Sequence, residues 1–350
     1  MSDIAAGQVL ARLSTVCRGH ALEDLGDRLV GLARLVERDM AAVERELLAS
    51  VAPAAHGERA VARGGAHLVA AGGKRLRPTC VVLAARLGGP VGEAALQLAV
   101  SVELVHSATL LHDDVVDLGD TRRGLATARS LYGNSVSIFA GDWLLVEALR
   151  RVRRHASPEV LAKLLDAIEE MIFAESLQLE NRGKLVLDEA VWRRVAEGKT
   201  ASLFAWAMLA GARVAGLGEA ETDALARFGL HLGTAFQAVD DVLDFEGDPS
   251  ATGKTLFADL REGKTTYPLI LAARRDPDLA ARLERGAADG DAAFAREILE
   301  GLRRTGALAE ARAFAADQAE RAADALSEVR AGPARDALYT VLDTTLARCA

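Results

Sequence analysis

Apolar residues recur at helical spacing along almost the whole chain. Within residues 21–50, leucine, valine and methionine return every three or four positions, and charged side chains occupy the opposite face. Similar runs follow to the C-terminus, separated by glycine, proline or asparagine clusters. The pattern predicts helices starting at Pro78 and after Pro333, and also over residues 21–50, 59–71, 93–117, 134–155, 158–180, 189–216, 219–245, 266–275, 277–285, 291–304 and 307–330.

The rest of the pattern gives no sign of a sheet. No segment alternates strictly enough for a useful strand, and no repeat of about 20–50 residues is present. Residues 246–264 are polar and predict a loop. We therefore expect an all-α, single-domain fold over residues 21–350, preceded by an N-terminal extension over residues 1–20.

Composition narrows the class of protein. The chain has 350 residues, of which 50% are hydrophobic, and its eight prolines leave room for long helices. The formal net charge of −8 argues against a nucleic-acid partner. Three scattered cysteines form no disulfide framework, and no apolar run reaches the roughly 18 residues of a membrane span. A cytoplasmic protein without a transmembrane segment is expected, although contact with a membrane surface is still allowed.

Two acidic motifs of the form D-D-x-x-D carry the first chemical signal. They are Asp113-Asp114-Val115-Val116-Asp117 and Asp240-Asp241-Val242-Leu243-Asp244. On a helix, the first and last aspartates of each motif share a face, where like charges repel unless a cation lies between them. Carboxylates without Cys or His favour a hard cation, and Mg²⁺ commonly joins a few carboxylates to substrate phosphates. One such motif could equally be a solvated acidic face, but two at the ends of apolar helices favour metal binding.

Basic residues near these motifs suit phosphate groups. Residues 72–78, G-G-K-R-L-R-P, place three cations after a flexible turn, and Arg122 and Arg123 follow the first acidic motif. His106 precedes Asp113 by two helical turns. Lysine also occurs in three G-K-T segments, but none has the earlier glycine or the preceding strand of a phosphate-binding P-loop. Taken singly, each basic motif is more often part of the surface, so their meaning depends on the acidic pair.

These motifs together resemble those of the trans-polyprenyl diphosphate synthases, and most closely those of long-chain (octaprenyl- and heptaprenyl-like) members. The matching segments occur in the family's order and spacing over about residues 25–345, and they are 72–78, 102–117, 122–124, 141–142, 199–201, 236–244, 253–254 and 259–264. One mild departure is Trp143, where the family more often has phenylalanine. The resemblance implies antiparallel helices around a deep central cavity, usually in a homodimer.

The resemblance also implies a role for each matching residue. Asp113, Asp117, Asp240 and Asp244 resemble ligands of Mg²⁺, with Asp114 and Asp241 in support. The family's pattern implies three ions, with Mn²⁺ as a substitute. The residues that resemble an isopentenyl diphosphate site are Lys74, Arg77, His106 and Arg123. Those that resemble contacts to an allylic diphosphate (geranyl, farnesyl or geranylgeranyl) are Arg122, Lys199, Thr200, Gln237, Lys254 and Lys264. The catalytic candidates are Asp113, Asp117, Lys199, Asp240 and Lys254.

The implied reaction is ionisation of the allylic diphosphate, attack by the isopentenyl double bond and loss of a proton. Ala108 and Thr109 lie one turn below Asp113 on the same helix and are small, with Val105 a further turn down, so we expect products longer than C20. Bulky residues of a neighbouring helix, such as Trp143, Leu144 or Phe173, are the alternative floor of the cavity. A farnesyl or geranylgeranyl diphosphate synthase is the alternative. A terpene cyclase would not need the 72–78 motif, and a non-catalytic regulatory subunit would have lost aspartates that this chain keeps.

Overall fold

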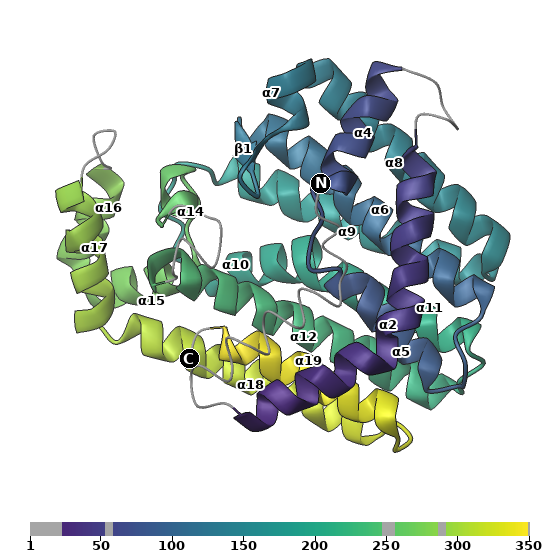
Figure 1. Cartoon of the computed structure of the whole chain (residues 1–350). Coiled ribbons are helices and arrows are strands. Elements are labelled where there is room, and N and C mark those ends of the chain that lie inside the picture. The colour runs from purple at the N-terminus through teal and green to yellow at the C-terminus, as the bar shows by residue number, and fades with distance from the viewer. Residues whose placement is uncertain (1–22, 53–58, 247–255, 286–291, 349–350) are drawn as a thin grey trace. The chain divides into compact units, whose positions relative to one another are not determined.

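The computed structural model describes residues 23–52, 59–246, 256–285 and 292–348. Helices make up nearly all the regular structure in these ranges (Figure 1). They are α2 (Glu23–Val51), α4 (Ala60–Ala70), α5 (Leu76–Arg86), α6 (Glu93–Val116), α7 (Ala128–Tyr132), α8 (Asn134–His155), α9 (Pro158–Glu180), α10 (Glu189–Ala196), a π-helical turn (Glu197–Ala201), α11 (Ser202–Val214), α12 (Glu219–Glu246), α14 (Ala258–Arg261), α15 (Tyr267–Arg275), α16 (Pro277–Arg285), α17 (Ala292–Arg304), α18 (Ala307–Ser327) and α19 (Pro333–Ala347).

The all-α prediction is confirmed, and most helix boundaries lie within two or three residues of those expected. Four short elements were not predicted: a hairpin of β1 (Thr121–Arg122) with β2 (Leu125–Ala126), the five-residue α7, the four-residue α14 and the π-helical turn. Of the predicted loop over 246–264, the described part contains α14, and residues 247–255 lie outside the described residues. The N-terminal extension over 1–20 also lies outside them.

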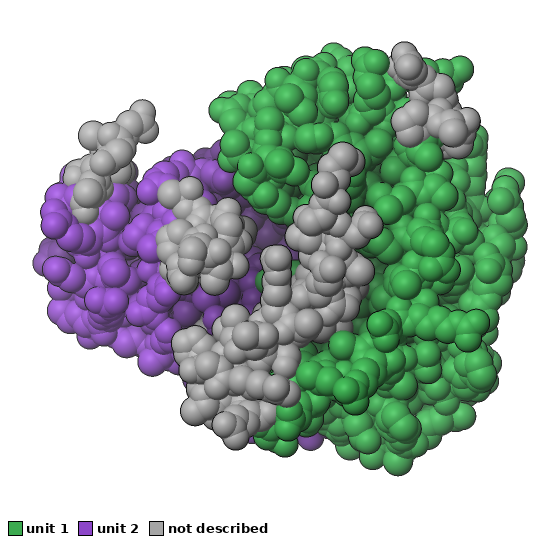
Figure 2. Space-filling view, viewed as in Figure 1, with its two compact units in different colours: residues 1–165, 203–226, 325–341 green, residues 166–202, 227–324, 342–350 purple. Residues whose placement is uncertain are grey.

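The chain divides into two compact units (Figure 2). The first comprises residues 1–165, 203–226 and 325–341, and the second comprises residues 166–202, 227–324 and 342–350. Each unit has its own buried apolar side chains. The first aspartate motif belongs to the first unit and the second motif to the second unit.

Helix α6 is the core helix of the first unit. It packs against α2, α4, α5 and α8, and most of its side chains are buried. By length and composition α6 is the one described helix that could cross a membrane, but 72% of its most apolar stretch is buried inside the protein. Its apolar character is therefore explained by packing.

Helices α6 and α8 run antiparallel in close contact. The Ser137 hydroxyl of α8 donates to the Leu111 carbonyl of α6, at 2.8 Å, and Arg151 of α8 reaches Gln97 of α6. A Cβ at Gly141 would lie 2.3 Å from Nε2 of His112, so any larger residue there would require the His112 ring to move. The contact orders the end of α6 that carries the aspartates.

The second unit is organised around the apolar side of α12. Trp192 of α10 stacks on Tyr267 of α15, with ring centroids 4.5 Å apart, and both belong to a buried cluster that includes Val242 and Phe245 of α12. Apolar residues of α17 and α18 complete the cluster. This packing holds the end of α12 that carries the second aspartate motif.

Candidate active site

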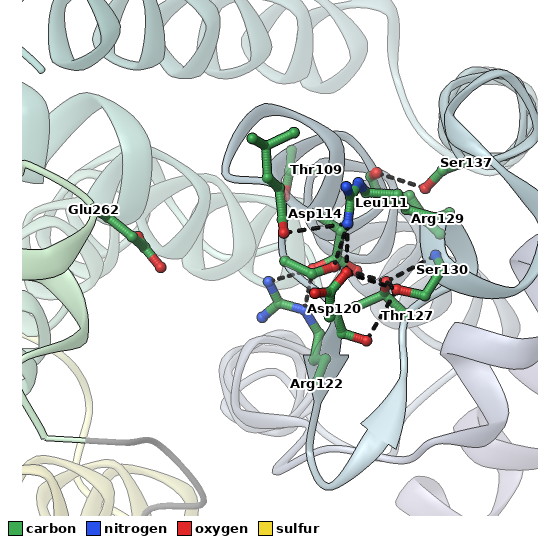
Figure 3. Close-up of polar contacts among 12 residues, drawn as sticks. Thr109, Leu111, Asp114, Asp120, Arg122, Thr127, Arg129, Ser130, Ser137 and Glu262 are labelled. Atoms are coloured by element: carbon green, nitrogen blue, oxygen red, sulfur yellow. Dashed lines mark hydrogen bonds and ion pairs between the residues drawn. The ribbon is translucent and has the colours of Figure 1, made fainter. Parts of the chain in front are cut away.

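The first aspartate motif forms the last turn of α6. Asp113 and Asp117 are partly buried, whereas Asp114 is buried and forms an ion pair with Arg122 at 2.8 Å (Figure 3). Asp117 is the C-cap residue, and its backbone N–H donates to the Asp113 carbonyl at 2.8 Å. The middle aspartate thus fixes the neighbouring hairpin, while the outer two share the more accessible side of the helix.

The hairpin that follows α6 brings Arg122 and Arg123 back to the helix end. Arg123 and Gly124 form its turn with φ values of 54° and 76°, and positive values at both positions are typical of a type I′ turn. Behind the hairpin, Thr127 caps α7 by accepting from the Ser130 N–H, and Arg129 pairs with Asp120 at 2.8 Å (Figure 3). These contacts hold the polar segment between α6 and α7 in one conformation.

The four residues expected to bind isopentenyl diphosphate, Lys74, Arg77, His106 and Arg123, all belong to the first unit. The charges of Arg77 and Arg123 act on His106. A Cβ at Gly73 would lie 3.0 Å from the Arg123 guanidinium, so Arg123 lies against the turn that precedes Lys74. Burial lowers the pKa of His106 well below its usual value, and the charges of Arg77 and Arg123 lower the pKa further. His106 is therefore neutral at pH 7 beside two cations, an arrangement that suits a polyanion.

The Arg77 side chain also contacts an aromatic ring. Its guanidinium lies over the Phe204 ring of α11, 4.5 Å from the ring centroid. Cation–π contact restricts the side chain without neutralising its charge. Lys74, by contrast, is exposed. The third cation of this segment, Arg75, is turned into the core and contacts Glu44 and Glu103, so it is not a binding residue.

The second aspartate motif lies at the end of α12, and each of its carboxylates has a different partner. Asp240 pairs with Arg348 at 2.7 Å. Asp244 accepts from the backbone N–H of Ala258, at 2.9 Å, and so holds the start of α14. The repulsion expected between Asp240 and Asp244 is therefore already relieved within the protein, which sequence spacing alone did not reveal.

Asp241 has a structural role. It is buried and accepts from Trp192 Nε1 at 2.8 Å, the Tyr267 N–H at 3.0 Å and Gln237 Nε2 at 2.9 Å. Burial raises the pKa of this carboxyl to about 7, the charge of Asp259 adds to the rise, and the three donors oppose it. Asp241 thus connects α12 to α10 and α15.

The π-helical turn carries Lys199 and Thr200. The Lys199 ammonium pairs with Glu175 and donates to Gln178 Oε1 at 3.1 Å, both on α9. Thr200 donates to Gln237 Oε1 at 2.9 Å, and Gln237 in turn donates to Asp241. A π-turn within a longer helix often marks a functional site. Here it brings two predicted allylic contacts, Thr200 and Gln237, together.

The two remaining predicted lysines have different outcomes. Lys264 follows α14, its side chain is 13% exposed, and its ammonium donates to Glu262 at 2.6 Å. Lys254 lies outside the described residues. The chain-length candidates Val105 and Ala108 are buried on α6, and Thr109 donates to the His106 carbonyl at 2.9 Å.

The acidic residues suit a hard cation shared with a ligand. Within the described ranges, no group of three or more His, Cys, Asp or Glu side chains could hold a metal ion alone. Oxygen-only donors that do not complete a shell are what Mg²⁺ uses when water and phosphate supply the rest. Oδ2 of Asp114 is also buried without a hydrogen-bond partner among the described residues, which leaves it open as an acceptor. The donor set therefore fits a divalent cation.

Several residues of the site have no sequence motif of their own. Glu175, Gln178 and Arg348 were missed because their partners lie far along the chain. Glu175 and Gln178 are polar residues within the otherwise amphipathic α9, which is a weak signal. Arg348 had no signal that could be recognised before the fold was known.

Comparison with known proteins identifies the class. The polyprenyl synthetase family model matches residues 58–298. The chain is 38% identical to the octaprenyl diphosphate synthase of Escherichia coli, over 78% of this chain and 85% of that protein, and 36% identical to the nonaprenyl diphosphate synthase of Mycobacterium tuberculosis, over 81% and 85%. A polyprenyl synthase from Caulobacter crescentus, solved with calcium and isoprenyl diphosphate, is 40% identical with a TM-score of 0.85, and the match covers 91% of this chain and 98% of that one.

The all-α fold and the similar structures therefore define an isoprenoid synthase fold. The chain belongs to the polyprenyl synthetase family and is a trans-prenyltransferase. The resemblance inferred from the motifs is thus confirmed.

Proposed function

We propose that this enzyme condenses isopentenyl diphosphate with an allylic diphosphate and repeats the step to make products longer than C20. The observation that carries the proposal is the cationic group of Arg77, Arg123 and neutral His106 in the first unit. An enzyme that only cyclises one allylic substrate has no need of this second anion site. The names of the E. coli and M. tuberculosis relatives support a long product.

The chain's own residues hold and orient the two substrates. Lys74, Arg77 and Arg123 neutralise isopentenyl diphosphate, and His106, uncharged at pH 7, offers a hydrogen bond. The contacts proposed for the allylic diphosphate are Arg122, Lys199, Thr200, Gln237, Lys254 and Lys264. Fixed cations aimed at a leaving diphosphate stabilise the negative charge that develops there.

Asp113 and Asp117 would hold divalent cations from the first unit, and Asp240 and Asp244 from the second. We propose Mg²⁺, three ions in all, with Mn²⁺ as a substitute. When bound, these ions supply Lewis-acid stabilisation of the departing diphosphate. Arg348 pairs with Asp240, and the Ala258 N–H donates to Asp244, so Asp240 would have to give up its arginine partner to hold a metal ion.

Small side chains on α6 support the product length. Ala108 is buried and Thr109 partly buried, directly before the aspartates, and Val105 lies a further turn down the helix. None of them is bulky, so α6 does not close the path of a growing chain with an aromatic ring. The allylic substrate proposed is geranyl, farnesyl or geranylgeranyl diphosphate.

The proposed assembly is a cytoplasmic homodimer. Exposed apolar side chains support it: Ile138, Phe139 and Val146 on α8 in the first unit, and Ile172 and Phe173 on α9 in the second. Such groups commonly mark contact surfaces.

We also propose peripheral contact with a membrane for product release. Arg150, Arg153 and Arg154 at the end of α8 are exposed, and cations of this kind favour anionic lipid surfaces. The contact needs no membrane span.

Incubation of the purified chain with labelled isopentenyl diphosphate, farnesyl diphosphate and Mg²⁺ tests the function. We expect label in a chloroform- or butanol-extractable product, none in EDTA, and recovery when Mg²⁺ is added back. Asp113→Ala or Asp240→Ala should reduce kcat by about two orders of magnitude or more, because each removes a proposed metal ligand. Undiminished turnover in EDTA would show that the metal assignment is wrong.

A further inference from the structure

Arg75 is the buried member of the three-cation segment that precedes α5. Its side chain is only 2% exposed, whereas Lys74, the residue before it, is exposed. Guanidinium has five N–H donors in a fixed plane, and here five acceptors surround it. They are both carboxylate oxygens of Glu44, at 2.9 and 3.0 Å, Oε1 of Glu103 at 2.7 Å, and the carbonyls of Val69 and Gly72 at 3.1 and 3.4 Å.

These acceptors come from separate elements of the first unit. Glu44 belongs to α2, Val69 to α4 and Glu103 to α6, while Gly72 is part of the turn itself. One side chain therefore ties the turn before α5 to three helices at once. The bidentate fork on Glu44 also fixes the plane of the guanidinium, which a lysine could not do.

The backbone at Arg75 is strained to allow this arrangement. Its φ of 51° and ψ of 34° are left-handed, a conformation that residues other than glycine seldom adopt. The Arg75 carbonyl accepts from both the N–H and the hydroxyl of Thr79, at 3.0 and 2.8 Å, which holds the strained residue against the first turn of α5. Such strain persists where the surroundings over-determine it, and it commonly accompanies function.

The cluster is also connected to the proposed isopentenyl diphosphate site. Glu103 lies one turn before His106 on α6, and its charge acts on Arg123 as well as on Arg75. The Arg123 guanidinium in turn lies against Gly73. A buried arginine with two glutamates is a poor source of net stability, because desolvation offsets the attraction. What the Arg75 cluster does instead is restrict the turn before α5 to one conformation.

We propose that Arg75 is a positioning residue: its buried cluster with Glu44 and Glu103 holds residues 72–77 in the one conformation that presents Lys74 and Arg77 to isopentenyl diphosphate. This inference rests on the proposed function of the anion site. It assigns to the middle cation of the segment a role different from that of its neighbours, since Arg75 itself touches no substrate.

The test is Arg75→Lys, which keeps the charge but loses the fork. We expect the Kd for isopentenyl diphosphate, measured by calorimetry without an allylic substrate, to rise about tenfold or more. The KM for isopentenyl diphosphate should rise in parallel, while the KM for farnesyl diphosphate and kcat at saturation stay within about threefold. Glu44→Gln, which removes the charge of one partly exposed partner, should weaken binding in the same direction by a smaller factor.

Arg86→Lys is the matched control. Arg86 pairs with Asp39, also on α2, at 2.7 Å, but belongs to the far end of α5 and not to the turn. The Arg86→Lys variant should leave the Kd for isopentenyl diphosphate unchanged. Circular dichroism and thermal unfolding of every variant establish that it is folded.

The outcomes separate this inference from the proposed function. If the unmodified protein does not bind isopentenyl diphosphate, the proposed function fails. If it binds, and folded Arg75→Lys and Glu44→Gln bind equally well, the positioning role is overturned. If neither variant folds, Arg75 serves the stability of the first unit alone, and the positioning role is again overturned.

Discussion

At the scale of single residues, the two groups of cations have different surroundings. Arg77 lies over an aromatic ring and acts on a neutral histidine in the first unit, whereas Lys199 is held by Glu175 and Gln178 in the second. Arg77→Ala should therefore raise the KM for isopentenyl diphosphate about tenfold or more, because a charged contact to phosphate is lost. Lys199→Ala should mainly change the allylic KM or kcat. Equal effects of both variants on both substrates in steady-state assays would refute the assignment.

Cys80 provides a test of core burial. Its side chain is fully buried on α5, and burial raises the pKa of the thiol to about 12, although the charge of Arg77 opposes the rise. We expect no alkylation of Cys80 by iodoacetamide in the native protein at pH 8, and rapid alkylation in guanidinium chloride, as mapped by peptide mass spectrometry. Native labelling of Cys80 would contradict the packing of α5.

The same thiol has a consequence for stability. An unfolded thiol ionises near pH 8.5, whereas the folded one stays protonated to about pH 12. The unfolded state therefore loses its proton first, so this group's contribution to stability declines as pH rises above about 8.5.

Residue types were largely predictable, but their orientations were not. The chemistry of carboxylates and cations predicts Asp113, Asp240 and Arg77 as site residues from the sequence, and these assignments stay predictions. Residue type alone does not separate Arg75 from Arg77, and only the family resemblance selected Arg77. The left-handed backbone at Arg75 was not predicted. The contact of Arg348 with Asp240 could not be predicted, because it depends on the tertiary fold.

At the scale of elements, the π-helical turn depends on a glycine. A Cβ at Gly198 would lie 2.7 Å from the Ala174 Cβ and 2.9 Å from the Glu170 carbonyl on α9. Gly198→Ala should push the turn away from α9, lowering the free energy of unfolding by about 1–3 kcal/mol and reducing kcat because Lys199 moves. Chemical denaturation and steady-state assays measure both effects.

Gly31→Ala is the matched control for this change. Gly31 lies within α2 with nothing within 4 Å of an added Cβ. Alanine there should raise the free energy of unfolding by about 0.5–1 kcal/mol through helix propensity and leave kcat unchanged. Equal stability changes for Gly198→Ala and Gly31→Ala would show that the close approach to α9 has no energetic weight.

The proposed path of the growing chain beside Ala108 of α6 can be tested by substitution. Ala108 is buried one turn before Asp113, so a phenylalanine there should fill space that a growing chain needs. Ala108→Phe should shift the dephosphorylated products to shorter chains on reversed-phase chromatography. Leu110→Phe, a change at a partly buried position on another side of α6, should leave the distribution as it is. An unchanged product from Ala108→Phe would contradict the proposed path.

Helices were predictable from the sequence because their signals are local. Gly88, Pro158 and Pro333 mark helix boundaries by backbone chemistry that acts within one turn. The hairpin at 121–126 and the π-helical turn were missed because each is short. The π-helical turn, in particular, is fixed by the contact of Gly198 with α9, which no helical periodicity records.

At the scale of the whole molecule, structural similarity to a member of the family extends over nearly all of the chain. The Caulobacter polyprenyl synthase structure covers 91% of this chain, and the all-α fold agrees with it. The single-domain description of residues 21–350 stays a prediction, as does the N-terminal extension over residues 1–20. Sedimentation of the purified chain should give a dimer, and a monomer would contradict the proposed assembly.

Repeated elongation of an allylic diphosphate to a long product can be measured with the purified enzyme. The most direct measurement is a chromatogram of dephosphorylated products from the purified chain, farnesyl diphosphate, labelled isopentenyl diphosphate and Mg²⁺. We expect labelled polyprenols longer than C20, in the range of about C30 to C40 or beyond. A chromatogram in which all label stops at C20 would contradict it, and the absence of any labelled polyprenol would contradict the activity itself.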